Sequence, residues 1–208
     1  GGTAASMKAT MSSLKTNPEL LSVLINPHAL CEGFQGPQQE DDSKPKYDEE
    51  LETWVAPFFM APINTKNIHR SNKLMNHIYG EDFQYNEMWI SGPGDEGKTT
   101  AEMIASANPI GGDDAPKPGE GPSREKRENG NYDILFCADI DNEVVKVSVS
   151  GDMDPGYGST SKMITESAVC LIKDANDLPG GIYTPASSLG KKLIKRLEDN
   201  AGLTFKVE

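Results

Sequence analysis

Residues 92–99 read GPGDEGKT, which matches the phosphate-binding pattern G-x-x-x-x-G-K-[ST]. In such a loop Lys98 would contact the β- and γ-phosphates and Thr99 would bind magnesium. The stretch ILFCAD supplies an apolar strand that ends in Asp139, the residue type that holds the metal in a Walker B strand. One hypothesis is therefore a P-loop NTPase that uses Gly92–Thr99.

The neighbouring residues argue against this hypothesis. The strand before a P-loop lies centrally in a parallel sheet and is continuously apolar, whereas the strand expected before Gly92 contains Glu87 and two further polar residues. Pro93 removes one of the backbone N–H groups that would face a phosphate. Asp95 and Glu96 would place two carboxylates beside an anion, which is unfavourable at short range.

A second group of polar residues lies in INTKNIHRSN, within a helix expected over residues 64–75. His69 could donate a proton to a double bond or imine that is being reduced. Asn64 and Arg70 could bind a substrate, since a guanidinium group holds carboxylate or phosphate well. The alternative, which we favour, is that His69 and Arg70 lie on the solvated helix face, with Arg70 in a structural ion pair.

A third group, Asp154-Pro155-Gly156-Tyr157, precedes a helix expected from Gly156 onward. A helix N-terminus offers free N–H groups and partial positive charge, which suit an anionic group. Asp154 and Gly156 are therefore candidates for substrate binding, and Tyr157 is a candidate proton donor. The favoured alternative is a capped helix start, in which Gly156 meets a backbone requirement and Tyr157 is packed.

Two other polar segments are expected to be structural. In PGEGPSREKRENG, Ser123 should cap a short helix that extends through Arg127, although Glu120 or Arg127 could equally contact another domain. In GGIYTPAS, Thr184 should cap the last helix. No catalytic role follows for these residues.

Composition narrows the class of protein. The chain has 208 residues and a net charge of −12, and no basic, aromatic-rich stretch offsets that charge, so nucleic acid is not an expected partner. The sequence shows no membrane-spanning run and no metal-ligand spacing, and we expect a cytoplasmic protein without a metal site. Three widely separated cysteines fit a reducing compartment, with Cys137 and Cys170 expected in the core.

The order of elements predicts an α+β fold, because helices, strands and mixed segments follow one another without regular βαβ alternation. We expect a single domain over residues 1–208, with a flexible linker near 92–122. A mainly antiparallel sheet should carry helices packed on one side. Its expected strands are Phe83 to Ile90, Tyr132 to Ile140, Val144 to Ser150 and Leu203 to Val207, and an amphipathic helix should cover Pro185 to Asn200.

Several stretches, in order and spacing, resemble the C-terminal half of the saccharopine dehydrogenase-like oxidoreductase family, which includes trans-acting enoyl reductases. The most specific are PGEGPS, DPGY and GGIYTP, and YDEELETWVAPFFMAPINTKNIHRSN and YGEDFQYNE also take part. The resemblance covers nearly the whole chain. It places GPGDEGKT in a variable part of the family that uses no P-loop.

The resemblance implies that an N-terminal Rossmann domain should bind NAD(P)H and a second α+β domain should cover the nicotinamide. The present chain begins about where that first domain should end, and it lacks a strand–GxGxxG–helix unit. We therefore expect a substrate-binding and dimerisation half with no cofactor-binding residues of its own, inactive alone. Its expected partners are a Rossmann domain, in cis or in trans, and a second copy of the chain. The substrate could be a lipid-like or polyketide enoyl group. A non-catalytic dimeric interaction module remains the other alternative.

Overall fold

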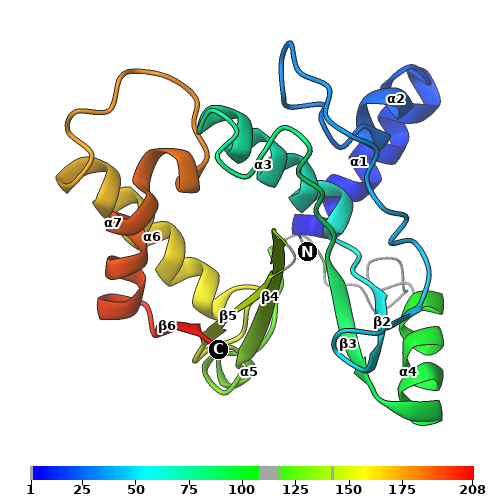
Figure 1. Ribbon diagram of the computed structural model, residues 1–208. Helices are drawn as coiled ribbons and strands as arrows, with labels where there is room; N and C mark the ends of the chain where they lie inside the picture. Colours follow the sequence, from blue (N-terminus) through cyan, green and yellow to red (C-terminus); the bar gives the residue numbers. More distant parts are fainter. Residues whose placement is uncertain (1, 108–116, 118, 142) are drawn as a thin grey trace. The chain divides into compact units, whose positions relative to one another are not determined.

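The chain folds into two compact units, residues 1–120 and 121–208, in the computed structural model, which describes residues 2–107, 117, 119–141 and 143–208 (Figure 1). Both units combine helices with a three-stranded antiparallel sheet. The first contains α1 (Gly2–Thr16), α2 (Leu20–Ile25), β1 (Lys46–Asp48), β2 (Thr53–Pro57), α3 (Ala61–Leu74), β3 (Met88–Gly92) and α4 (Gly94–Ser106). The second contains α5 (Arg124–Glu128), β4 (Tyr132–Ile140), β5 (Glu143–Gly151), α6 (Gly158–Lys173), α7 (Pro185–Asn200) and β6 (Leu203–Val207).

The sheet of the first unit has β2 at its centre, paired antiparallel with β1 and β3. Val55 and Ala56 of β2 are buried, and α4 packs against β2 and β3 through its buried small residues Gly97 and Ala101. Two prolines bracket the turn into α3, and the second, Pro62, falls in the first helical turn, where a missing N–H costs nothing.

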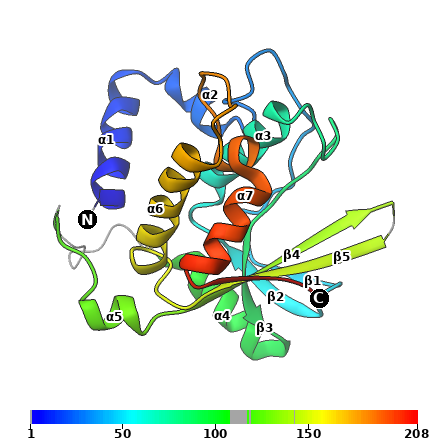
Figure 2. The same cartoon turned by 90° about the vertical axis from the view of Figure 1, so that its left-hand side faces the viewer.

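The sheet of the second unit has β5 at its centre, paired along its whole length with β4 and at its C-terminal end with β6. Side chains alternate between the two faces of a strand, so Val149 and its β6 partner Phe205 share one face. Both pack against a cluster of buried residues from α6, α7 and β6. Figure 2 shows α6 and α7 lying side by side.

Helix α7 supplies much of this core. Leu189, Leu193 and Leu197 recur at helical spacing on one face and are buried. A capping box begins the helix, in which the Thr184 hydroxyl accepts a bond from the Ser187 backbone N–H and the Ser187 hydroxyl accepts one from that of Thr184. At Gly190 the backbone has φ 47° and ψ −131°, so the helix is kinked one residue after Leu189.

The α+β class and the antiparallel pairing are confirmed, as are the expected bounds of β4, β6 and α7. The expectation of one sheet is wrong, because the segment expected as strand 83–90 forms strand only over Met88–Gly92 and belongs to the other unit. The linker expected near 92–122 is wrong over Gly94–Ser106, which is helical. Residues 108–116 and 118 of that linker lie outside the described residues.

Of the two cysteines expected in the core, Cys170 is buried and Cys137 is exposed. Cys31 and Cys170 are buried, and burial raises the pKa of both thiols. Cys137 is exposed, so its expected place in the core is wrong. It lies on the polar face of β4, and the apolar residues beside it in the sequence point to the other face.

Among the helices that the structure describes, none is both long enough and apolar enough to cross a bilayer.

The buried stripe on α7 gives a direct stability prediction. Leu193→Ala should lower the free energy of unfolding by about 2–5 kcal/mol, because it leaves a cavity in the core of the second unit. Ile194→Ala is the matched control, since the Ile194 side chain is 39% exposed and its loss should cost much less. Urea unfolding of both variants checks this, and equal losses would contradict the packing described.

Candidate functional site

The GPGDEGKT segment does not form a phosphate-binding loop. Strand β3 ends at Gly92 and helix α4 starts at Gly94, so the residues that would surround a phosphate are already helical. Gly92 has φ 106°, and Gly97 lies directly against the Gly92 carbonyl, where a Cβ would clash. The segment is a tight strand-to-helix turn.

The side chains that the NTPase hypothesis needs are also engaged elsewhere. The Lys98 ammonium lies over the Trp54 ring, 5.5 Å from its centroid, and the Thr99 hydroxyl donates to the Asp95 carbonyl at 2.9 Å. The preceding strand belongs to an antiparallel sheet, and Asp139 lies in the other unit. The structure thus argues against the P-loop hypothesis.

Helix α3 turns a polar stripe inward. Thr65, His69 and Asn72 are buried, and His69 is only 4% exposed. The expectation that His69 lies on the solvated face is therefore wrong. Asn72 explains part of this burial, because its amide donates to the Gly80 carbonyl and accepts from the Tyr79 N–H, closing the turn after the helix.

The His69 ring packs against a second histidine that the sequence did not single out. The rings of His28 and His69 have centroids 4.3 Å apart, and Phe83 meets His69 edge-on at 5.6 Å. The Nε2 atoms of both histidines are buried and have no hydrogen-bond partner among the described residues. Burial lowers the pKa of His28, and burial together with the His28 charge lowers the pKa of His69 to about 4. His69 is therefore neutral at pH 7.

Asn64 takes part in a short polar chain. Its amide donates to Glu87 Oε2 at 2.9 Å, and the Tyr85 hydroxyl donates to Glu87 Oε1 at 2.6 Å. Burial, followed by the bond to Glu87, raises the pKa of Tyr85. The sequence offered one signal for this pair, since Tyr85 and Glu87 are two residues apart and share a face of an extended segment.

Arg70 and its helix neighbour Lys66 bind main-chain carbonyls at the end of α2 and just after it. Arg70 Nη1 donates to the Leu30 carbonyl at 2.8 Å, and Lys66 Nζ donates to the Leu24 carbonyl at 2.6 Å. These bonds anchor α3 to the segment that holds His28. Asn64, His69 and Arg70 thus lie on one helix, and each contacts a neighbouring segment of the first unit.

The turn before α6 is built around the carboxylate of Asp154. It accepts backbone N–H bonds from Gly156 at 2.9 Å, Tyr157 at 3.2 Å and Gly158 at 2.6 Å. The free amides at the start of α6 are therefore bound by a residue of the chain itself. Asp154 acts as the cap that the alternative interpretation described, and it occupies the Gly156, Tyr157 and Gly158 amides.

The position of Tyr157 does not fit the alternative interpretation, which expected this side chain to be packed. Its side chain is 45% exposed rather than packed, and the ring lies alongside Gly121, where an added Cβ would be 3.7 Å away. Gly130 lies even closer to Asp154, where a Cβ would come within 2.7 Å of the Asp154 main chain. The end of the PGEGPSREKRENG segment and the DPGY turn, far apart in sequence, thus meet in the second unit.

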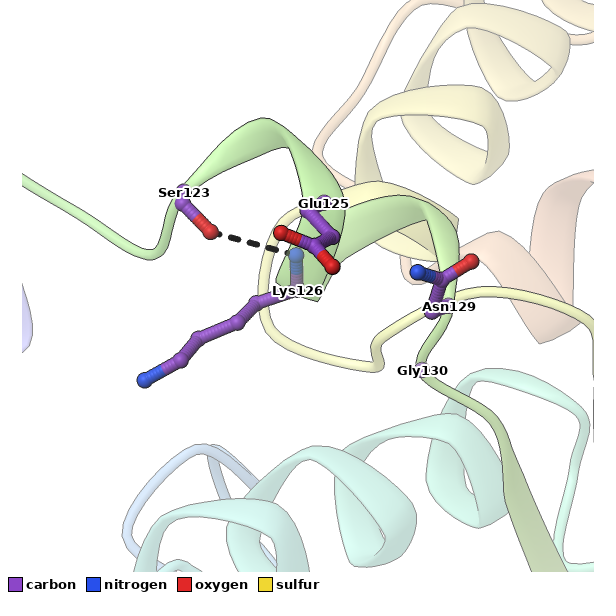
Figure 3. A pocket seen from close by; sticks show the side chains of 5 residues that line it. All are labelled: Ser123, Glu125, Lys126, Asn129 and Gly130. Carbon is purple, nitrogen blue, oxygen red and sulfur yellow. Dashed lines mark hydrogen bonds between the residues drawn. The ribbon is translucent and has the colours of Figure 1, made fainter.

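A surface hollow of about 450 Å³ opens on α5 at this junction (Figure 3). The Ser123 hydroxyl accepts the Lys126 N–H at 3.2 Å, which confirms the predicted cap. The Lys126 side chain extends away from the helix. The residues that line the hollow are Ser123, Glu125, Lys126, Asn129 and Gly130. We call the hollow, together with Tyr157 and the Asp154 turn, the α5 junction.

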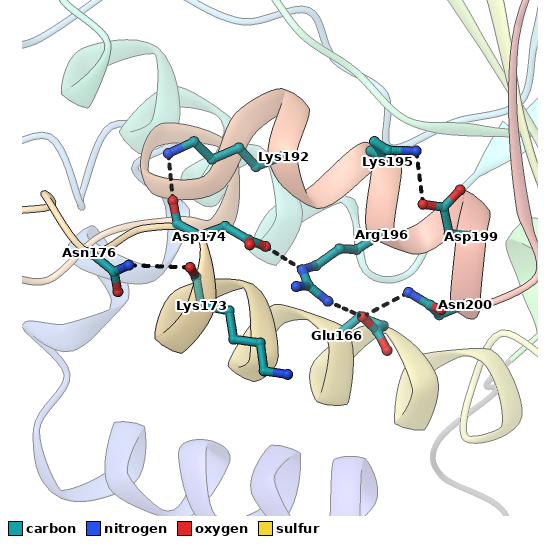
Figure 4. A network of polar contacts seen from close by, with 9 residues as sticks. All are labelled: Glu166, Lys173, Asp174, Asn176, Lys192, Lys195, Arg196, Asp199 and Asn200. Atoms are coloured by element: carbon teal, nitrogen blue, oxygen red, sulfur yellow. Dashed lines mark hydrogen bonds and ion pairs between the residues drawn. The ribbon is translucent and has the colours of Figure 1, made fainter.

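A polar network joins α6 to α7. Arg196 of α7 binds Asp174 and, at 3.2 Å, Glu166, which ties α7 to α6 (Figure 4). Asn200 adds a bond to Glu166, and Lys192 donates to the Asp174 carbonyl at 2.6 Å. The bond to Arg196 lowers the pKa of Asp174. Among the residues described, His, Cys, Asp and Glu side chains form no group able to hold a metal ion.

Comparison with known proteins finds relatives that are named trans-acting enoyl reductases. It is 31% identical over 229 residues to the Mycobacterium tuberculosis protein named "Putative trans-acting enoyl reductase Rv2449c", covering 95% of this chain and 54% of that protein. It is 27% identical over 228 residues to a "Trans-acting enoyl reductase" of Mycobacterium ulcerans and 27% identical over 224 residues to one of Mycobacterium bovis, covering 95% of this chain and 53% of each.

The chain thus spans about half the length of the curated relatives it matches. No protein-family model matches it. No solved structure matches it either.

The buried histidine pair makes stability depend on pH. His69 takes up a proton near pH 6.5 in the unfolded chain but near pH 4 when folded, so folding stability falls as pH drops between these values. The loss should reach about 3 kcal/mol for 2.5 pKa units. Urea unfolding at several pH values checks this, with His69→Leu expected to flatten the dependence and His77→Gln to retain it. An unchanged slope in His69→Leu would contradict the burial described.

Proposed function

We propose that this chain is the substrate-binding and dimerisation half of an NAD(P)H-dependent enoyl reductase of the saccharopine dehydrogenase-like type. The similarity to trans-acting enoyl reductases over 95% of the chain carries the proposal. Both units together form this half. The nucleotide is bound mainly by a Rossmann domain, supplied in cis or in trans, which fits the coverage of about half of each relative.

The α5 junction is our choice for the substrate side. It offers a hollow that Gly130 helps to line, and Gly130 lies against Asp154 of the turn that carries the exposed Tyr157. His69, in contrast, is buried, neutral and packed against His28. Two of the segments that carry the resemblance, PGEGPS and DPGY, converge there.

Reduction of an enoyl group needs a hydride at one carbon of the double bond and a proton at the other. Bound NAD(P)H supplies the hydride. In our proposal the Tyr157 hydroxyl supplies the proton, and the Asp154 carboxylate, by holding the Gly156–Gly158 amides, fixes the backbone that carries Tyr157. Asp154 is then a positioning residue.

A non-catalytic dimeric interaction module is the second candidate. The exposed apolar side chains Ile134, Phe136 and Ile140 of β4 favour it, because such surfaces usually contact another protein.

Ligand-induced thermal shifts test the proposal. An enoyl thioester at a hundred times its Kd should stabilise the chain by about 2.7 kcal/mol, whereas NADPH alone and ATP with magnesium should have little effect. Tyr157→Ala should reduce the thioester shift, and Tyr183→Ala, the same change elsewhere in the second unit, should leave it intact. The chain alone should not oxidise NADPH.

If the thioester raises the melting temperature of Tyr157→Ala as much as that of the wild type, the substrate binds outside the α5 junction. No thioester shift, with a dimer in solution, would favour the non-catalytic module.

A further inference from the structure

The apolar face of the second sheet continues past the helices that cover it. Val149 and Phe205 lie under the core of α6 and α7, but the same face goes on to Ile134, Phe136 and Val207, which are 46%, 41% and 74% exposed. Figure 2 shows the β4–β5 hairpin extending beyond both helices. The opposite face carries mainly polar residues, so only the apolar face of the sheet is expected to pack against another element or protein.

Strand β4 also leaves one edge of this sheet open. The order of strands is β4-β5-β6, and β4 pairs with β5 alone among the described strands. In an antiparallel pair, alternate residues direct their N–H and C=O groups away from the partner. Alternate residues of the nine in β4 therefore present a row of main-chain donors and acceptors beside an exposed apolar face. Such an edge is a template for another strand.

We propose that β4 pairs antiparallel with β4 of a second copy of this chain. The two sheets then become one continuous six-stranded sheet, whose uncovered apolar faces lie on the same side of the dimer. This names the surface for the dimerisation that the proposed function includes, and it holds whether or not the chain is half of an enzyme.

The carboxylates of β4 favour one register for the pairing of the two β4 strands. If the two-fold axis passes through Leu135, Ile134 lies opposite Phe136 of the second copy and Asp133 lies opposite Cys137. Asp139 then faces Asn131. Shifting the centre to Phe136 would set Asp133 directly against Asp139 on both sides of the two-fold axis, which is unfavourable.

In this register β4 is complementary to itself, and we therefore propose a second copy of the chain as the partner of its open edge. A two-fold axis through Leu135 matches apolar residues with apolar residues and keeps each carboxylate away from another carboxylate. Each chain carries a net charge of −12, so the copies repel at long range and the contact should tighten with added salt.

Sedimentation velocity across a micromolar concentration range tests the surface. The chain should form dimers, more tightly at high salt than at low salt. Phe136→Lys should weaken the dimer at least about tenfold, because a lysine on an edge strand opposes pairing. Val144→Lys is the matched control, since Val144 is similarly exposed but lies on the other face of the hairpin, and it should dimerise normally.

Oxidative cross-linking tests the register. Asp133→Cys should give a disulfide-linked dimer through Cys137 of the second copy, since directly opposed residues have Cα atoms close enough for a disulfide. The wild-type chain should cross-link poorly through Cys137 alone. Efficient wild-type cross-linking would place the axis at Cys137 and overturn the register.

A monomer at all concentrations would overturn the proposal. Protection from hydrogen exchange in that monomer, at the β4 amides that face away from β5, would show that another part of the chain covers this edge. A dimer unchanged by Phe136→Lys would place the contact elsewhere.

Discussion

The pairing of β5 with both of its neighbours is the constraint on which the second unit depends. It fixes which side chains share a face, so that Val149 and Phe205 reach the α6–α7 core while Ile134 and Phe136 extend the same face beyond it. The strand ends at Gly151, where a side chain would collide with the Tyr132 ring. The chain turns there into the Asp154 loop, so the same pairing also positions the α5 junction.

The polar residues of α3 show how a group that could do chemistry can serve structure instead. Asn64, His69 and Arg70 have the residue types of a reductase site, yet each contacts a neighbouring segment of the first unit. GPGDEGKT is a comparable case. Its glycines serve a strand-to-helix turn, and its lysine packs on Trp54. In both segments the observed contacts show a structural role, which the residue types alone did not reveal.

Local patterns predicted the elements well where the chain repeats regularly. Alternation and helical spacing gave β4, β6 and α7 at their observed bounds, and Ser123 and Thr184 were recognised as caps. Partition into two sheets was not predictable, because pairing between strands far apart in sequence leaves no local signal. Burial of His69 was missed for a related reason, since the His28 ring that covers it comes from a distant segment.

Hydrogen–deuterium exchange in the presence of an enoyl thioester tests the central claim most directly, because it locates the substrate on the chain. We predict slower exchange of the amides in residues 121–130 and 153–160, with those of α3 unchanged. Protection confined to α3 and the segment around His28, or absent from both, would contradict the assignment of the α5 junction as the substrate side.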